Sequence, residues 1–185
     1  MNKRTLCSAL TALTACTAGT QPGASPTRTA ATYWLYVANE SADLVSRVAF
    51  TPGNGVRVDA DVPVGIMPAD IDGPHGLAVS PDGRAWFVSV AHGTPNGRVW
   101  KYAAGADTAA GRVELGNFPA SMTTSADGQF LYVANFNLHG DPVPSSVSIV
   151  YTPTMAEVAR PVTCIMPHGS RINVAGSHHY STCMH

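Results

Sequence analysis

The sequence has few charged residues and almost no net charge. Its 185 residues include 11 Lys and Arg against 12 Asp and Glu, for a formal net charge of −1. The basic side chains are scattered along the chain and form no patch. This pattern provides no attraction for nucleic acid or for an anionic lipid surface. We therefore expect neither as a partner.

Motifs of nucleophilic and nucleotide chemistry are also missing. The chain has no Gly-x-Ser-x-Gly, no glycine-rich phosphate loop and no Cys-x-x-Cys. These motifs position a serine nucleophile, a phosphate group and a redox thiol pair, so the sequence gives no support to those chemistries. Its longest apolar run near the N-terminus, residues 6–15, is too short to span a membrane.

That run follows Lys3 and Arg4 and fits a secretory signal segment. It ends in Leu13-Thr14-Ala15-Cys16, which resembles the lipobox of bacterial lipoproteins. The resemblance implies that residues 1–15 are a signal peptide and that Cys16 is the lipid attachment site. The alternative is a secreted protein cleaved a few residues later. Either way the protein leaves the cytoplasm, periplasmic or at the cell surface, and touches a membrane only through the anchor.

The segment 16–32 is rich in Thr, Ala, Ser, Gly and Pro, with one charge, Arg28. Such a composition cannot bury a core and predicts a flexible tether. The remainder, 33–185, has many short apolar runs separated by turn residues, which is typical of an all-β domain with little or no helix.

A hairpin pattern repeats along this domain. Residues 74–88 read as a strand, a Ser-Pro-Asp-Gly turn and a second strand. Related copies begin at Pro119 and Pro167, which gives spacings of 45 and 48 residues between successive prolines. A shorter fragment, Leu35-Tyr36-Val37-Ala38-Asn39, matches 131–135 residue for residue and has no first strand before it.

Each repeat has room for four antiparallel strands. We place them at about 76–80, 86–90, 97–102 and 110–115, and again at about 120–124, 130–135, 145–151 and 156–163. Four strands in about 45 residues is the spacing of a β-propeller blade. The predicted fold class is therefore all-β, a β-propeller with four-stranded blades.

Leu-Tyr-Val-Ala-Asn after such a turn resembles the YVTN family of bacterial propellers. That group is similar to lactonase-type propellers and to the propeller domain of nitrous oxide reductase. The resemblance implies a fold more than an activity, because one fold hosts many functions. A propeller needs about four to eight blades to close, and this chain supplies about three. We expect the sequence to be a fragment of a longer protein that supplies the missing blades.

Two cysteines remain in the predicted domain. Cys164 and Cys183 could form a disulfide in an oxidising compartment. Their separation in the sequence does not settle whether the geometry allows it, so free or metal-bound thiols stay open.

Four histidines fall at two repeat positions. His75 and His168 share the start of a first strand, and His92 and His185 share the end of a second. These positions lie at the same edge of a hairpin, so all four should approach one face of the propeller. We call it the loop face.

Counting strand partners outward from the turn at 80–85 places His75 opposite Val90. The same pairing rule in the third copy of the hairpin places His168 opposite Cys183. His185 points to the same side as Cys183. The sequence thus predicts a metal site of His75, His168, Cys183 and His185, with Met166 or Met184 as weak additions. Copper suits such ligands best, and zinc is acceptable. The alternative is that these histidines bond loop carbonyls and that the cysteine is a buried apolar residue.

Three functions are compatible with these patterns. The first, which we favour, is a lipid-anchored propeller that binds a small molecule or a protein on its loop face without catalysis. The second adds the transition-metal site, as in a redox-associated enzyme. The third is a lactonase-type hydrolase in which Asp72 and His75 act as acid and base.

Overall fold

The computed structural model describes residues 30–65, 72–92 and 96–185. The predicted signal peptide and lipid attachment site, and the tether up to residue 29, lie outside this part. The described residues form only strands, turns and loops. Within these ranges no helix has the length and hydropathy needed to cross a membrane.

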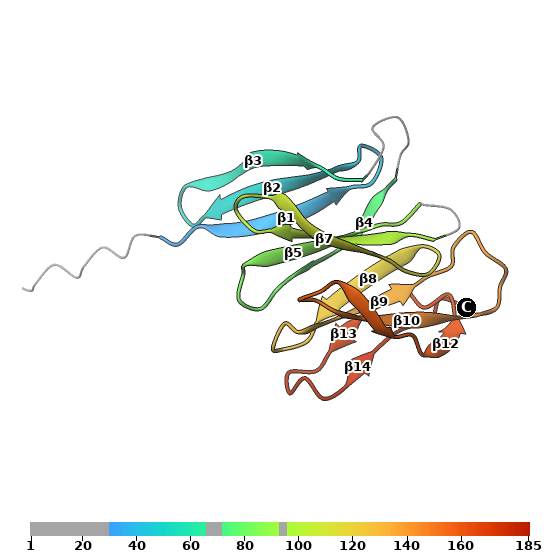
Figure 1. Cartoon of the computed structure of the whole chain (residues 1–185). Coiled ribbons are helices and arrows are strands. Elements are labelled where there is room, and N and C mark those ends of the chain that lie inside the picture. Colours follow the sequence, from blue (N-terminus) through green and yellow to red (C-terminus); the bar gives the residue numbers. More distant parts are fainter. Residues whose placement is uncertain (1–29, 66–71, 93–95) are drawn as a thin grey trace, which may run out of the picture.

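Four antiparallel sheets follow one another along the chain (Figure 1). The first has three strands in the order β1-β2-β3: β1 (Tyr33–Asn39), β2 (Leu44–Thr51) and β3 (Gly55–Pro63). The second has four strands in chain order: β4 (Pro74–Val79), β5 (Ala85–Val90), β6 (Arg98–Ala103) and β7 (Thr108–Glu114).

The third sheet contains β8 (Pro119–Thr124), β9 (Phe130–Asn135), β10 (Pro144–Tyr151) and β11 (Ala156–Ala159). A further strand, β12 (Val162–Ile165), also pairs with β10. The predicted fourth strand at 156–163 is therefore split around Pro161, which has no N–H to donate. A small hairpin of β13 (Arg171–Ile172) and β14 (His179–Tyr180) comes last.

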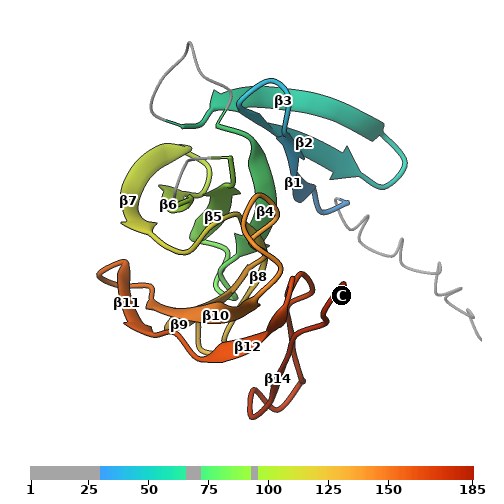
Figure 2. The same cartoon turned by 90° about the vertical axis from the view of Figure 1, so that its right-hand side faces the viewer.

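The sheets are arranged in an arc, from β1–β3 through β4–β7 and β8–β12 to β13–β14 (Figure 2). The first strands of the two complete sheets, β4 and β8, pack side by side along the inside of the arc. This arrangement confirms the predicted fold, an incomplete β-propeller. Among the described residues the first sheet has no strand inside β1, as the isolated fragment at 35–39 predicted.

The repeated turns explain why the period is visible in the sequence. In the turn at 80–83, Ser80 Oγ donates to Asp82 Oδ1 (2.6 Å), and the same carboxylate accepts from the Arg84 amide (3.0 Å). Ser125 and Asp127 repeat these bonds in the next sheet. The turn glycines Gly83, Gly128 and Gly176 all have positive φ, at 68°, 72° and 70°. The two aspartates are therefore turn residues, whose side chains stabilise their own turns.

Apolar side chains fill the space between neighbouring sheets. Trp86 lies between the first two sheets, where its ring stacks on Tyr36 and Tyr102 with centroids 5.0 and 4.2 Å apart. A second cluster, which includes Phe87, Leu131 and Met155, fills the space between the second and third sheets. The packing fixes the angle between blades, and so it fixes where their loops meet.

Candidate functional site

The loop face gathers four histidines and one glutamate, and each of the four sheets contributes to the group. We call it the histidine cluster. Glu40 follows β1, His75 is the second residue of β4, and His92 lies just beyond β5. His139 is in the loop between β9 and β10, and His168 precedes β13. The prediction that His75, His92 and His168 approach one face agrees with this arrangement.

Glu40 is the centre of the cluster. Its Oε1 lies 3.2 Å from Nδ1 of His75 and 2.9 Å from Nε2 of His92. Burial opposes ionisation of this carboxyl, but hydrogen bonds and charge from His92 and His75 outweigh it and lower its pKa. Glu40 is therefore an acceptor at neutral pH, and both imidazoles donate to it. The other ring nitrogens are His75 Nε2 and His92 Nδ1, and the second of these faces His139.

His92 and His139 meet through their ring nitrogens. Nδ1 of His92 lies 3.4 Å from Nε2 of His139. The ring of Phe118 packs edge-on against both, with centroids 5.0 and 5.6 Å away, and against His75 at 5.1 Å. Phe118 is buried, so it serves as a fixed support for three of the four imidazoles.

His168 contacts the ring of His75. The two rings are perpendicular with centroids 5.7 Å apart, and Phe136 contacts His168 at 4.9 Å. Burial and the neighbouring His75 charge lower the pKa of His168 below its usual value. His168 is therefore neutral at physiological pH.

The pairing rule of the sequence analysis was wrong by one residue at this edge. Leu77 pairs with Val88 as the rule requires, but Pro74, and not His75, pairs with Val90. A β-bulge between Pro74 and Leu77 accounts for the extra residue, and the freed amide of Gly76 donates to Ser89 Oγ (2.7 Å). The third copy shows the same shift.

There, Pro167 and not His168 pairs with Cys183. Cys183 forms a disulfide with Cys164, so its sulfur is not a free thiolate ligand. His185 is exposed and has no hydrogen bond or ring contact with the described residues of the cluster. Met184 is also exposed, whereas Met166 packs against the apolar residues around Phe118. The predicted ligand set thus does not assemble as proposed.

The structure also changes the carboxylate partner of His75. The predicted partner, Asp72, accepts the main-chain amide of His92 at its carbonyl (3.0 Å), and its carboxylate lies beside Gly65. The carboxylate that bonds His75 is that of Glu40. Among the described residues, no three His, Cys, Asp or Glu side chains form a group that could hold a metal ion.

Sequence reasoning missed Glu40 and His139. Both follow a second strand of a repeat, in the same type of loop as His92. That loop position was the available signal, because the isolated fragment at 35–39 already marked where such a strand ends. Glu40 comes one residue after that fragment, and His139 comes four residues after its copy at 131–135.

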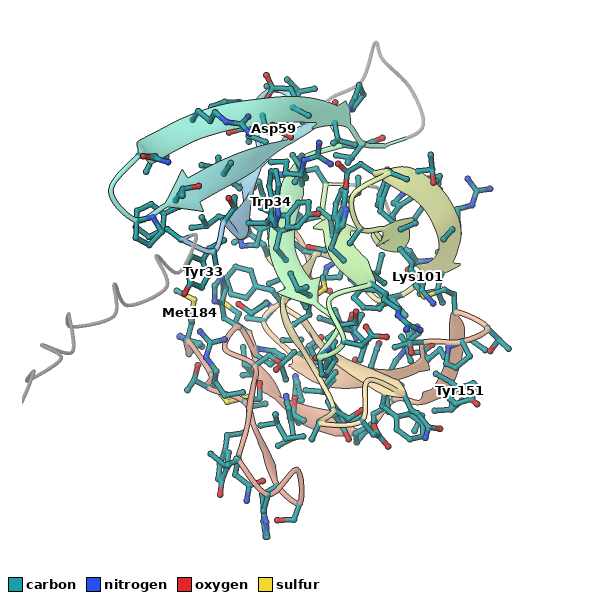
Figure 3. All side chains as sticks on the ribbon, turned by 90° about the vertical axis from the view of Figure 1, so that its left-hand side faces the viewer. Tyr33, Trp34, Asp59, Lys101, Tyr151 and Met184 are labelled. Carbon is teal, nitrogen blue, oxygen red and sulfur yellow. A yellow bond between two sulfur atoms is a disulfide. The ribbon has the colours of Figure 1, made fainter. Side chains whose placement is uncertain are left out.

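Two clefts lie at the opposite end of the sheets. One, of about 480 Å³, is lined by Trp34, Tyr36, Arg47, Val79 and neighbouring turn residues, and Figure 3 shows Trp34 where the first sheet faces the second. The other lies over the turns at Asp82 and Asp127, with Lys101 on its wall. The carboxylates of those turns are already bonded within them, and Arg47 is paired with Asp59 and Asp107. Among the three regions, only the histidine cluster pairs a carboxylate with imidazoles.

No family model matches the sequence, and neither does any curated protein sequence. Solved structures do match the fold. The chain superposes on hydrazine synthase of Kuenenia stuttgartiensis with a TM-score of 0.67 and 21% identity, over 81% of this chain and 38% of that one. It also superposes, with slightly lower TM-scores, on two proteins whose descriptions name a lactonase.

The first of these is described as a 6-phosphogluconolactonase, from Bacteroides uniformis, with a TM-score of 0.64 and 21% identity over 81% of this chain and 44% of the other. The second is the periplasmic gluconolactonase of Pseudomonas aeruginosa, with a TM-score of 0.63 and 21% identity over 82% of this chain and 47% of the other. The chain thus spans less than half the length of these structures. At this identity the likeness shows the fold alone, that of a β-propeller.

Proposed function

We propose that this chain is part of an extracytoplasmic β-propeller that hydrolyses a lactone at its loop face. The observation that carries the proposal is the ionised carboxylate of Glu40, shared by His75 and His92 where all four sheets meet. A carboxylate that orients an imidazole is the usual arrangement of a general base. The lactonase-type proteins with this fold support the choice of substrate.

In this proposal His75 activates water. Glu40 accepts the Nδ1 proton of His75 and so keeps the lone pair of Nε2 free. Nε2 removes a proton from water as the water oxygen bonds to the lactone carbonyl carbon. The ring C–O bond then breaks, and the proton passes from the imidazolium to the departing alkoxide. The product is a hydroxy acid, and His75 is neutral again.

His168 has a different part in the reaction. Its lowered pKa keeps it neutral, and its ring lies against that of His75. A neutral imidazole can donate one hydrogen bond without competing with His75 for the proton. We assign it the stabilisation of negative charge that develops on the carbonyl oxygen.

The test is the hydrolysis of glucono-1,5-lactone by the purified chain, followed as proton release above the uncatalysed background. Glu40→Gln removes the acceptor that orients both imidazoles, and we expect kcat to fall about 100-fold or more. The matched control is Glu114→Gln, an exposed carboxylate outside the histidine cluster that accepts from Asn96. Asp72→Asn tests the pairing predicted from the sequence, and we expect little effect.

Two results would overturn the proposal. One is wild-type protein that hydrolyses no lactone of a panel above background. The other is equal rates for the Glu40 and Glu114 variants. Ligand binding without turnover would favour the non-catalytic binding module instead.

The location outside the cytoplasm is part of the proposal. The Cys164–Cys183 disulfide supports it, because such bonds persist in oxidising compartments. So does the periplasmic gluconolactonase that shares the fold. We further propose that Cys16 carries the lipid, as the lipobox resemblance implies. Detergent-phase partitioning that survives Cys16→Ser would refute the anchor.

A further inference from the structure

One contact in the histidine cluster is not needed for lactone hydrolysis. His92 and His139 come from different sheets, and their rings are tilted by 39° with Nδ1 and Nε2 3.4 Å apart. Both are within reach of solvent, since His139 is exposed and the His92 side chain is one-third exposed.

Glu40 determines which nitrogen of His92 is available. Nε2 of His92 lies 2.9 Å from the Glu40 carboxylate, and an imidazole that donates there has its lone pair on Nδ1, which lies 3.4 Å from Nε2 of His139. An imidazole that donates one N–H to a carboxylate and presents the other nitrogen is the arrangement found around protein-bound metals. The same bond fixes the ring orientation and raises the basicity of the free nitrogen.

The distance between the two nitrogens also fits a shared ion. In tetrahedral geometry with Zn–N bonds of about 2.05 Å, two ligand nitrogens lie about 3.3 Å apart. The observed separation is 3.4 Å, long for a direct hydrogen bond. A square-planar ion would need the two nitrogens closer together, so the geometry favours zinc over copper(II).

Both rings are held in place by their surroundings. Phe118 packs against each of them, and its own position is fixed by burial. The loop that carries His139 is closed by a bond from the Gly140 amide to the Asn137 carbonyl (3.1 Å). A Cβ on Gly73 would lie 2.1 Å from the His92 ring, so that ring fills the space a side chain would otherwise occupy.

We propose that His92 Nδ1 and His139 Nε2 bind a zinc ion at the loop face. Since no third histidine, cysteine or carboxylate among the described residues completes a group, water or an oxygen ligand occupies the other positions. With only two protein ligands, the site should hold zinc less tightly than a closed four-ligand structural site does. The site differs from the one predicted from the sequence, and it does not depend on lactone hydrolysis.

Calorimetric titration of zinc into the chelator-treated full chain tests the proposal, with the absorption of Co²⁺ as a second probe. We expect one saturable site and the intense visible bands of tetrahedral cobalt. His92→Gln and His139→Gln should each abolish saturation. His178→Gln, which changes an exposed histidine outside the cluster, should bind as wild type does. His168→Gln should also do so, which separates this site from the one predicted from the sequence.

Glu40→Gln provides a graded test. It leaves both ligand nitrogens in place but weakens the acceptor behind His92, and we expect an affinity 10- to 100-fold lower. Absence of saturable binding, or unchanged binding by both ligand variants, would overturn the proposal and leave an ordinary N–H···N hydrogen bond. Zinc binding with no lactone hydrolysis would refute the proposed function alone, and the reverse result would refute only the zinc site.

Discussion

Glu40 is the residue on which the loop-face chemistry depends. One oxygen of its carboxylate accepts from two imidazoles, and both bonds favour the ionised form over the neutral one. Removing the charge therefore leaves His75 and His92 without a fixed tautomer. The carboxylate acts as an orienting group on both sides of the cluster, toward water activation at His75 and toward His139 at His92.

His168 links the cluster to stability. Burial and the charge of His75 hold the pKa of His168 in the folded chain below the ordinary value of 6.5. As the pH falls, the unfolded chain therefore binds a proton at this histidine before the folded chain does. This contribution to stability is complete above about pH 6.5 and is lost as the pH falls through the unfolded and then the folded pKa. Burial also lowers the pKa of His179, so this histidine contributes to the pH dependence of stability with the same sign.

We therefore expect the melting temperature of the wild type to fall between pH 7 and pH 5. In His168→Gln the fall should be smaller by a few degrees, because one of the two contributions is gone. Thermal unfolding monitored by circular dichroism across this range measures the difference. His178→Gln should keep the wild-type slope, and parallel curves for His168→Gln and the wild type would disprove this role of His168.

At the scale of the elements, the hairpin that starts each repeat has a built-in irregularity. The residue before the first-strand proline has positive φ in every copy: Gly73 at 64°, Phe118 at 50° and Met166 at 53°. A β-bulge follows the proline, so the first strand has one residue more than its partner strand over this stretch. Phe118 adopts this conformation although it is not a glycine, and its ring packs against the imidazoles of the cluster.

Gly73→Ala tests this geometry. The new Cβ would meet both an unfavourable φ and the ring of His92. Gly83→Ala is the matched control, because its φ is 68° but no atom lies within 4 Å of the added carbon. We expect the control to lose about 1 kcal/mol of unfolding free energy and Gly73→Ala to lose at least about 1 kcal/mol more. Equal losses in urea denaturation would show that His92 does not occupy the space.

The sequence was sufficient for the repeat but not for its side-chain register. The turns at Gly83 and Gly128 and the regular spacing predicted the strands, because turn chemistry is local. The bulge was invisible, since pairing counted from the turn cannot detect an extra residue further along the strand. As a result the side chain assigned opposite His168, that of Cys183, belongs instead to a disulfide.

At the scale of the whole molecule, the site depends on the docking of the first sheet on the second, because Glu40 belongs to one and His75 and His92 to the other. Asp107 helps to hold these sheets together at the end away from the cluster. Its carboxylate accepts from Trp86 Nε1 (2.9 Å) and pairs with Arg47 of β2. Only 8% of its side chain is exposed, so these bonds are shielded from water.

Asp107→Ala would leave the Trp86 indole N–H without its acceptor and remove one partner of Arg47. We expect a loss of about 2–3 kcal/mol of unfolding free energy, because buried polar groups that lose a partner are costly. Hydrogen exchange should rise first in β1, β2 and β3, and least in β8 and β9. Uniform loss of protection across all sheets would mean that Asp107 does not act at the boundary between the first two blades.

The most direct test of the account is a double-variant cycle on lactone hydrolysis, with Glu40→Gln, His75→Asn and the two combined. If Glu40 works by orienting His75, either single change already disables the pair, so the double variant should be about as slow as the slower single one. Losses in kcat that multiply would show that the two residues act independently, and would contradict a carboxylate–imidazole site at the loop face.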